Sequence, residues 1–172
     1  MVKVENILSE SIEIPVNVNV SIIDNKIVVK GPNGNVERTM KWKPKINIEN
    51  NKIVITSNSL MDLNTVKAHV KNMLKGVQEP FKKHLKIVHA HFPITLEVKG
   101  NKILIKNFLG EKKPREARII GNVKIEVKGK EVFMTSCDIE ALGQTYANIR
   151  QATRIRNRDS RVFQDGIYEV ED

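Results

Sequence analysis

Two histidines, His89 and His91, have the spacing in this 172-residue chain that most suggests metal binding. In an extended segment, residues two apart point to the same side, so both imidazoles could face one ion. A stable site needs further ligands, but His69 and His84 lie at no metal-like spacing and no cysteine lies nearby. We therefore expect no metal here, and interpret the pair as packing side chains or as phosphate contacts.

The single cysteine, Cys137, is the next residue that could do chemistry. It directly precedes Asp138, which we expect to cap a helix, and a helix N-terminus lowers the pKa of a thiol. No histidine or basic residue lies close in sequence to activate it, and one cysteine excludes an internal disulfide. The chain also has no Gly-x-Ser-x-Gly elbow, zinc-protease helix or dinucleotide-binding glycine motif. We expect no catalytic residues, no cofactor and no enzymatic activity.

Arginines near the C-terminus give a stronger signal, and it indicates binding of a polyanion. Residues 150–161 contain five arginines and one opposing acid, Asp159, whereas a solvated face would carry interleaved glutamates and more lysine. From Arg154 onward the arginines alternate, which is typical of an extended arm with its guanidinium groups on one side. Such planar forks suit bidentate contacts with phosphate. The candidate contacts are Arg150, Arg154, Arg156, Arg158 and Arg161.

A second basic stretch lies in residues 110–118, Gly-Glu-Lys-Lys-Pro-Arg-Glu-Ala-Arg. Together with two lysines of a preceding predicted strand, it adds the candidates Lys102, Lys106, Lys112, Lys113, Arg115 and Arg118. Aromatic residues make up only 5% of the chain, which argues against a base-stacking surface. Contacts to phosphates and to the shape of a structured RNA fit this composition better.

The overall composition is that of a folded basic protein, with 40% apolar residues, 28% charged residues and a net charge of +9. Residues 80–119 hold 10 Lys+Arg against 3 Asp+Glu, whereas residues 1–79 hold 11 against 8. This uneven distribution implies a polyanionic partner: nucleic acid first, an anionic membrane surface second. No stretch approaches the roughly 18 apolar residues of a membrane-spanning helix. We expect no signal peptide, because no apolar run follows Met1–Glu5.

An internal repeat organises the chain. Ile14-Pro15 matches Phe92-Pro93 at a spacing of 78 residues, and the run Asn25–Lys30 matches Asn101–Lys106 at 76. Farther on, Thr56-Ser57 matches Thr135-Ser136 at 79. Small loop insertions would produce this drift, so the pattern indicates a tandem duplication of one module of about 75 residues.

The first copy predicts antiparallel strands followed by one helix. Alternation over residues 16–22 predicts a strand, joined at Asp24-Asn25 to a second over 26–30, and strands over 46–49 and 52–56 pair around Asn50-Asn51. The Gly31–Gly34 segment has the outline of a nucleic-acid-clamping G-x-x-G loop, but it joins strands, so we interpret it as a turn before a segment leading outward. A helix from Ser59 to a stop at Gly76 carries the stripe Leu63, Val66, Val70, Met73, Leu74 and Val77.

The second copy predicts strands over 94–98, 103–106, 123–127 and 131–135. Its helix, capped by Asp138, carries the stripe Ile139, Leu142, Thr145, Ile149 and Ala152. We therefore expect an α+β fold of two tandem duplicated modules, each an antiparallel sheet covered by one helix. The expected domains are residues 1–80 and 81–172, joined by a linker near Lys75–His89.

Three motifs in this order resemble a known family. They are Ala90–Ile94 (A-H-F-P-I), Asn107–Arg118 (N-F-L-G-E-K-K-P-R-E-A-R) and the C-terminal signature Gln151–Tyr168. They resemble universal large-subunit ribosomal protein number six, in its archaeal and eukaryotic branch, over nearly the whole chain. The chain departs from that branch in its last four residues, Glu169–Asp172, where the family usually has an apolar and then a basic residue. We expect these acids to face solvent or a protein neighbour.

The resemblance implies a structural constituent of the large ribosomal subunit, ribosome-bound and cytoplasmic, without cofactor, metal or membrane partner. It implies binding to large-subunit rRNA, mainly through the second domain, near the sarcin–ricin loop and the region where translational GTPases dock. Neighbouring large-subunit proteins would be further partners. The basic residues of the loop and arm would contact RNA, while Phe163, Asp165, Gly166 and Tyr168 would fix the arm against the domain. An alternative is a non-ribosomal tandem interaction module whose basic face binds an acidic protein or an anionic membrane.

Overall fold

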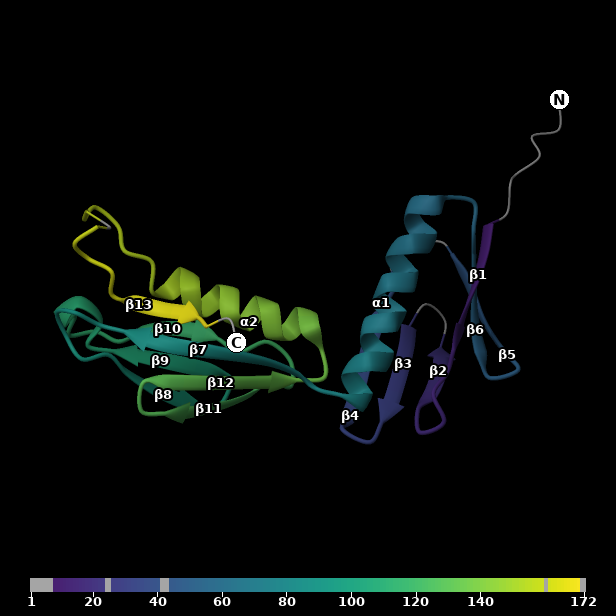
Figure 1. Ribbon diagram of the computed structural model, residues 1–172, viewed down its shortest axis with the longest axis horizontal. Helices are drawn as coiled ribbons and strands as arrows, with labels where there is room; N and C mark the ends of the chain where they lie inside the picture. Colours follow the sequence, from purple (N-terminus) through teal and green to yellow (C-terminus); the bar gives the residue numbers. More distant parts are fainter. Residues whose placement is uncertain (1–7, 24–25, 41–43, 160, 171–172) are drawn as a thin grey trace, which may run out of the picture. The chain divides into compact units, whose positions relative to one another are not determined.

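A computed structural model describes residues 8–23, 26–40, 44–159 and 161–170. The chain divides into two compact units with the boundary between Pro80 and Phe81 (Figure 1). The expected turn at Asp24-Asn25, the N-terminal residues 1–7 and the acids Glu171 and Asp172 lie outside the described residues.

The first unit consists of six strands and a helix. They are β1 (Leu8–Glu13), β2 (Asn19–Ile23), β3 (Lys26–Gly31), β4 (Gly34–Thr39), β5 (Lys45–Glu49), β6 (Lys52–Ser57) and α1 (Leu60–Gln78). The strands form two antiparallel sheets in the orders β1-β6-β5 and β2-β3-β4, and α1 packs on strands of both. The hairpin turns occur where predicted: Asn50 and Asn51 have positive φ angles of 44° and 63°, and Gly31 pairs with Gly34 across the β3–β4 turn.

The second unit repeats this arrangement and adds one strand. Its elements are β7 (Phe81–Val88), β8 (Thr95–Lys99), β9 (Lys102–Lys106), a 3-10 turn (Phe108–Gly110), β10 (Arg115–Arg118), β11 (Lys124–Lys128), β12 (Glu131–Ser136), α2 (Ile139–Ala152) and β13 (Gly166–Glu169). The sheets have the orders β10-β9-β8 and β11-β12-β7-β13. Helix α2 contacts strands of both sheets, and β13 lies beside β7 (Figure 1).

The two units share one topology, which confirms the predicted α+β duplication, although each unit has two small sheets and not one. Strand order β5-β6-β1 in the first unit becomes β11-β12-β7 in the second. The register is also kept: Ile12 pairs with Ile53 in the first unit, and Leu85 pairs with Val132 in the second. Both helices cover the buried faces of their strands, which hold the core residues of each unit.

Several predicted elements were wrong in extent. The expected linker near Lys75–His89 contains β7, which lies inside its sheet between β12 and β13. Strand β2 begins only at Asn19, leaving Val16 97% exposed. The segment Val36–Met40, expected to lead outward, instead pairs with β3 as far as Thr39. Helix α1 continues past Gly76 to Gln78. In α2, Ile139 is exposed and Ala141 replaces it in the buried stripe.

The helix N-termini differ in how they are capped. Asp138 accepts a hydrogen bond from the Glu140 N–H at 2.9 Å, as the sequence predicts. The Ser59 side chain makes no such bond. A feature common to both units precedes the helices: the hydroxyl oxygens of Ser57 and Ser136 accept bonds from the backbone N–H groups two residues ahead, each at 3.1 Å.

Close packing at Gly31 gives a stability prediction. A Cβ at this position would lie 2.8 Å from Cβ and Cγ2 of Val77, whose β-branched side chain has little freedom in a helix. We expect Gly31→Ala to lower the free energy of unfolding by about 1–3 kcal/mol. Gly143→Ala is the control: nothing lies within 4 Å of the added Cβ, and helix propensity predicts a gain of about 0.5–1 kcal/mol. Urea denaturation measures both, and effects of the same sign would contradict the prediction.

Candidate nucleic-acid interface

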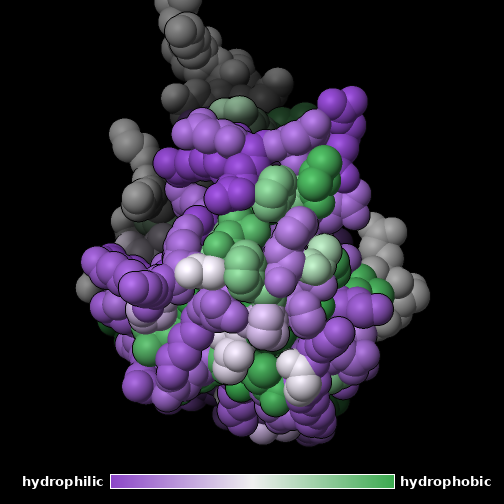
Figure 2. All heavy atoms as spheres, turned by 90° about the vertical axis from the view of Figure 1, so that its left-hand side faces the viewer, coloured by the Kyte–Doolittle hydropathy of each residue, from purple (hydrophilic) through white to green (hydrophobic). Residues whose placement is uncertain are grey.

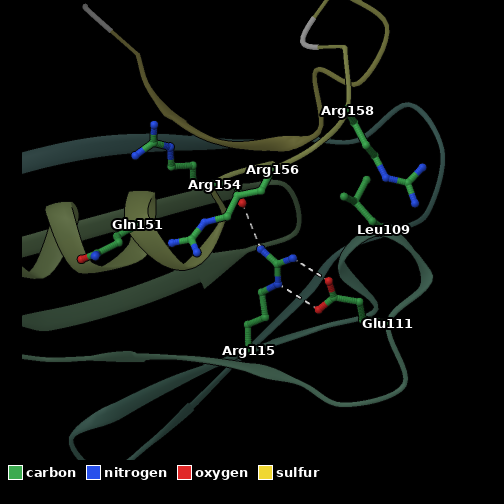
Figure 3. A pocket seen from close by; sticks show the side chains of 7 residues that line it. All are labelled: Leu109, Glu111, Arg115, Gln151, Arg154, Arg156 and Arg158. Atoms are coloured by element: carbon green, nitrogen blue, oxygen red, sulfur yellow. Dashed lines mark hydrogen bonds and ion pairs between the residues drawn. The ribbon is translucent and has the colours of Figure 1, made fainter.

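The end of the second unit from which the segment after α2 projects is covered mainly by hydrophilic side chains, with smaller hydrophobic areas between them (Figure 2). Two segments meet there. We call residues 107–114, between β9 and β10, the β9–β10 loop, and residues 154–165, between α2 and β13, the arm. A hollow of about 310 Å³ lies between them, lined by Leu109, Glu111, Arg115, Gln151, Arg154, Arg156 and Arg158 (Figure 3).

The β9–β10 loop is shaped by a run of left-handed backbone. Asn107, Leu109 and Gly110 have φ angles of 58°, 52° and 77°. The Asn107 side chain donates to the Pro93 carbonyl at 3.0 Å, and Phe108 inserts into the core with 1% of its surface exposed. A buried aromatic beside a tight turn fixes the loop to the unit. It leaves the next two cations, Lys112 and Lys113, exposed.

Arg115 lies at the base of the hollow and is held within the protein. Its Nε and Nη2 donate to the two carboxylate oxygens of Glu111 at 2.8 and 2.5 Å. Its Nη1 donates to the Ala152 carbonyl at 2.9 Å and to the Arg154 carbonyl at 3.2 Å. Figure 3 shows the bonds to Glu111 and Arg154. The guanidinium carbon also lies 4.4 Å from the ring centroid of Phe108. The four hydrogen bonds use most of the five N–H donors of the guanidinium group.

The arm is less regular than the sequence predicts. Asn157 has a φ angle of 58°, so the chain bends there, and the expected alternation through Arg158 is interrupted. All three arginines at 154, 156 and 158 nevertheless line the same hollow beside the β9–β10 loop. Arg161 turns back instead and forms an ion pair with Asp159, at 2.9 Å between Nη2 and Oδ2.

A stack of side chains holds the far part of the arm. Arg158 lies 4.7 Å above the ring of Phe163, which stacks on His91 with centroids 4.5 Å apart. His91 Nδ1 lies 2.7 Å from an oxygen of Asp165, a residue that is only 1% exposed. The other Asp165 oxygen accepts bonds from the N–H groups of Ala90 and His91 at 2.8 and 3.2 Å. These contacts confirm that Phe163 and Asp165 fix the arm against the unit.

Of the two histidines, His91 therefore has a packing role, because its ring stacks on Phe163. Among the described residues there is no group of three or more histidine, cysteine or acidic side chains placed to hold a metal. Burial raises the pKa of Asp165, but the hydrogen bonds from His91 and Ala90 outweigh it, so the pKa lies below its ordinary value. The carboxylate is accordingly charged over the neutral range.

Strand β13 completes the attachment of the arm. Tyr168 donates from its hydroxyl to the Gln164 carbonyl at 3.2 Å, and Arg150 lies 4.8 Å above its ring. Gly166 is buried against the same ring, because a Cβ there would lie 2.9 Å from it. Glu169, the first of the unusual acids, forms an ion pair with Lys83 of β7. Glu169 is exposed, in agreement with the expectation that it faces solvent, and its ionic partner is a lysine of the same unit.

Three of the predicted contacts lie on the other face of the β8–β9–β10 sheet. The inward-facing residues of these strands are Ile103, Ile105 and Ala117. Their sequence neighbours Lys102, Lys106 and Arg118 therefore point to the outer face of the sheet, away from the core. Lys102 pairs with Glu116 at 2.8 Å and Lys106 with Glu97 at 2.5 Å. These ion pairs lower the pKa of both glutamates below their ordinary value, chiefly through the lysine hydrogen bonds. The structure therefore does not bring these cations into the hollow.

The thiol of Cys137 agrees with the expectation that this residue is not activated. Burial raises the pKa of its thiol, with a smaller opposing effect from the charge of Lys124, so the helix N-terminus does not produce a low pKa here. Glu111 and Gln151 also line the hollow, and neither was predicted from the sequence. The four-residue spacing of Glu111 and Arg115 was a usable signal for the first of them.

Within the described residues no helix is long and apolar enough to cross a membrane.

Fold and charge together define a class: a basic protein of two duplicated α+β domains, the second presenting guanidinium groups around a hollow. Comparison with known proteins agrees with the division into two duplicated domains. The family model described as ribosomal protein L6 matches residues 14–80 and 92–166, one segment in each unit. The chain belongs to the ribosomal protein L6 family, which makes it a structural constituent of the ribosome and confirms the resemblance drawn from the three motifs. This is a family of ribosomal proteins and not of enzymes.

Curated relatives are similar over nearly the full length of both chains. The large ribosomal subunit protein uL6 of Methanobrevibacter smithii is 47% identical over 168 residues, covering 94% of each chain. That of Methanothrix thermoacetophila is 46% identical over 167 residues, covering 93% of this chain and 94% of its own. That of Methanococcus vannielii is 43% identical over 171 residues, covering 96% and 94%. These relatives are archaeal, in agreement with the archaeal and eukaryotic branch indicated by the C-terminal signature.

Proposed function

We propose that this ribosomal protein binds large-subunit rRNA through its second unit, near the sarcin–ricin loop and the region where translational GTPases dock. It acts there as a structural component of the cytoplasmic large subunit and has no catalytic role. Neighbouring large-subunit proteins are its other partners. The observation that carries the proposal is the convergence of Arg154, Arg156 and Arg158 on one hollow beside the β9–β10 loop.

The chemistry of this surface favours a phosphate backbone. Arg154 and Arg156 are exposed and take part in none of the ion pairs found among the described residues, and the same holds for Lys112 and Lys113 at the loop. Several cations that keep a fixed spacing can neutralise successive phosphates and release their counterions. Planar guanidinium groups add bidentate geometry to that charge.

The first test is fractionation of cell lysate on a sucrose gradient, followed by a high-salt wash of the large-subunit peak. We expect the protein to remain with the large subunit. Recovery in the light fractions alone would overturn the ribosomal role, and capture on acidic proteins or anionic vesicles would then support the alternative module.

The location is tested by directed hydroxyl-radical cleavage. Cys137 is changed to Ser, and a single cysteine carrying an iron chelate is placed at Lys113 or, as a control, at exposed Glu49 of the first unit. The Lys113 probe is expected to cleave rRNA in and around the sarcin–ricin loop, and the Glu49 probe elsewhere. Cleavage far from that loop by the Lys113 probe would contradict the proposed location.

A further inference from the structure

We infer that Glu111 and Arg115 are positioning residues that hold the β9–β10 loop and the arm together as one surface, so that Glu111 favours RNA binding despite its negative charge. The inference rests on the proposed function, because it concerns the same surface. It departs from the sequence analysis, in which Arg115 is a phosphate contact and Glu111 has no role.

The contacts of Arg115 connect three segments of the chain. Glu111 belongs to the β9–β10 loop, Ala152 is the last residue of α2, and Arg154 is the first residue of the arm. The carbonyls at the end of a helix lack partners within the helix, so a guanidinium that binds them fixes the helix end. One side chain thus ties the loop to the point where the arm begins.

The first unit shows that the site of Arg115 faces inward. Arg115 pairs with Ile105 on β9, and the equivalent residue of β4, paired with Val29 on β3, is Val36. Val36 is 7% exposed, and the Arg115 side chain is 28% exposed. In both units the hairpin is also bound to the end of its helix, because in the first unit the Asn33 N–H donates to the Val77 carbonyl at 3.2 Å. Arg115 provides in the second unit the connection that Asn33 provides in the first.

Glu111 makes the inference testable by the sign of an effect. A carboxylate at a phosphate-binding surface repels its ligand, so removal of the charge should strengthen binding if nothing else changes. If Glu111 orients Arg115 and the loop, its removal releases Lys112 and Lys113 from their fixed positions and weakens binding. The two roles therefore predict opposite changes in Kd.

The experiment uses the full chain and an rRNA fragment that contains the sarcin–ricin loop. Binding is measured for Glu111→Gln, Arg115→Lys and Arg115→Ala, with Glu116→Gln as the control. Glu116 is an exposed carboxylate on the opposite sheet face that pairs with Lys102. This variant therefore removes the same charge without affecting the bonds of Arg115 to Glu111, Ala152 and Arg154, which we call the brace. We expect Glu111→Gln to weaken binding roughly three- to tenfold and Glu116→Gln to leave it unchanged or slightly stronger. Arg115→Lys keeps the charge but loses the fork, and is expected to be as weak as Arg115→Ala.

Tighter binding by Glu111→Gln, or Arg115→Lys binding as well as the unchanged protein, would overturn the inference. Amide hydrogen exchange of the free protein provides a second readout. Residues 107–118 and 152–158 should exchange faster in Glu111→Gln and not in Glu116→Gln, and equal rates would count against the brace. If the unchanged protein fails to bind the fragment, the proposed function fails, while exchange in the free protein still decides whether the brace exists.

Discussion

Replacement of Arg154 and Arg156 by alanine is expected to make the dependence of rRNA affinity on salt shallower by about 1.4 to 1.8 units in a plot of log Kd against log salt. Each cation that neutralises one phosphate contributes about 0.7 to 0.9 units to this slope. Both side chains are exposed at the hollow and neither belongs to the stack that holds the arm. The fold should therefore be unchanged, and filter binding at several salt concentrations measures the slope.

The pair Lys102→Gln and Lys106→Gln is the matched control, because it removes the same formal charge. These lysines form ion pairs on the other face of the β8–β9–β10 sheet. We expect the slope to stay nearly unchanged in this variant. Equal changes in both double variants would mean that net charge, and not the hollow, determines binding.

Asp165→Ala is expected to produce the largest loss of stability, about 3 kcal/mol in the free energy of unfolding of the second unit. The buried carboxylate accepts bonds from the side chain and N–H of His91 and from the N–H of Ala90. Alanine would leave these donors without their charged partner and release Phe163 from its stack. Urea denaturation measures the loss, and limited proteolysis should show earlier cleavage in the arm. A change below about 0.5 kcal/mol, the range of ordinary surface substitutions, would contradict this role.

The pH dependence follows from the lowered pKa of Asp165. A carboxyl group with a lowered folded-state pKa contributes stability that is fully present above its unfolded value of about 3.9. That contribution is lost as the pH falls through the folded value. The difference between the unchanged protein and Asp165→Asn should thus keep its full size from about pH 5 upward and shrink below about pH 4. A constant difference across this range would show that the charge is not the stabilising feature.

Local patterns predicted most of the elements but not the strands that pair over long distances. The hairpin over residues 46–56 was predictable because alternation and an Asn-Asn turn occur together. Strand β7 was missed because its lysines obscure the alternation of apolar and polar residues. Lys83 lies on the inner side of the strand, where its ammonium group pairs with Glu169 and contacts the ring of Tyr146. Strand β13 has four residues, and its assignment requires the partner β7, which is 78 positions earlier when Gly166 is counted from Val88.

The candidate site was predictable as a set of cations and not as a geometry. The arginines at 154, 156 and 158 were found from their density, and they do share one hollow. Charge density alone cannot distinguish an arginine that faces solvent from one whose donors are engaged inside, as at Arg115. Nor can it show that Lys102 and Lys106 are neutralised by glutamates on neighbouring strands, because that depends on strand register.

The arm is attached at both ends, to β10 through Arg115 and to β7 through β13. A basic tail with a free end must lose the conformational entropy of each residue it immobilises on RNA, about 1–2 kcal/mol per residue. In this protein the restriction occurs when the second unit folds, before any RNA is present. We therefore expect most of the electrostatic attraction to appear as affinity, and association to proceed by docking of a preformed surface with little heat-capacity change from coupled folding.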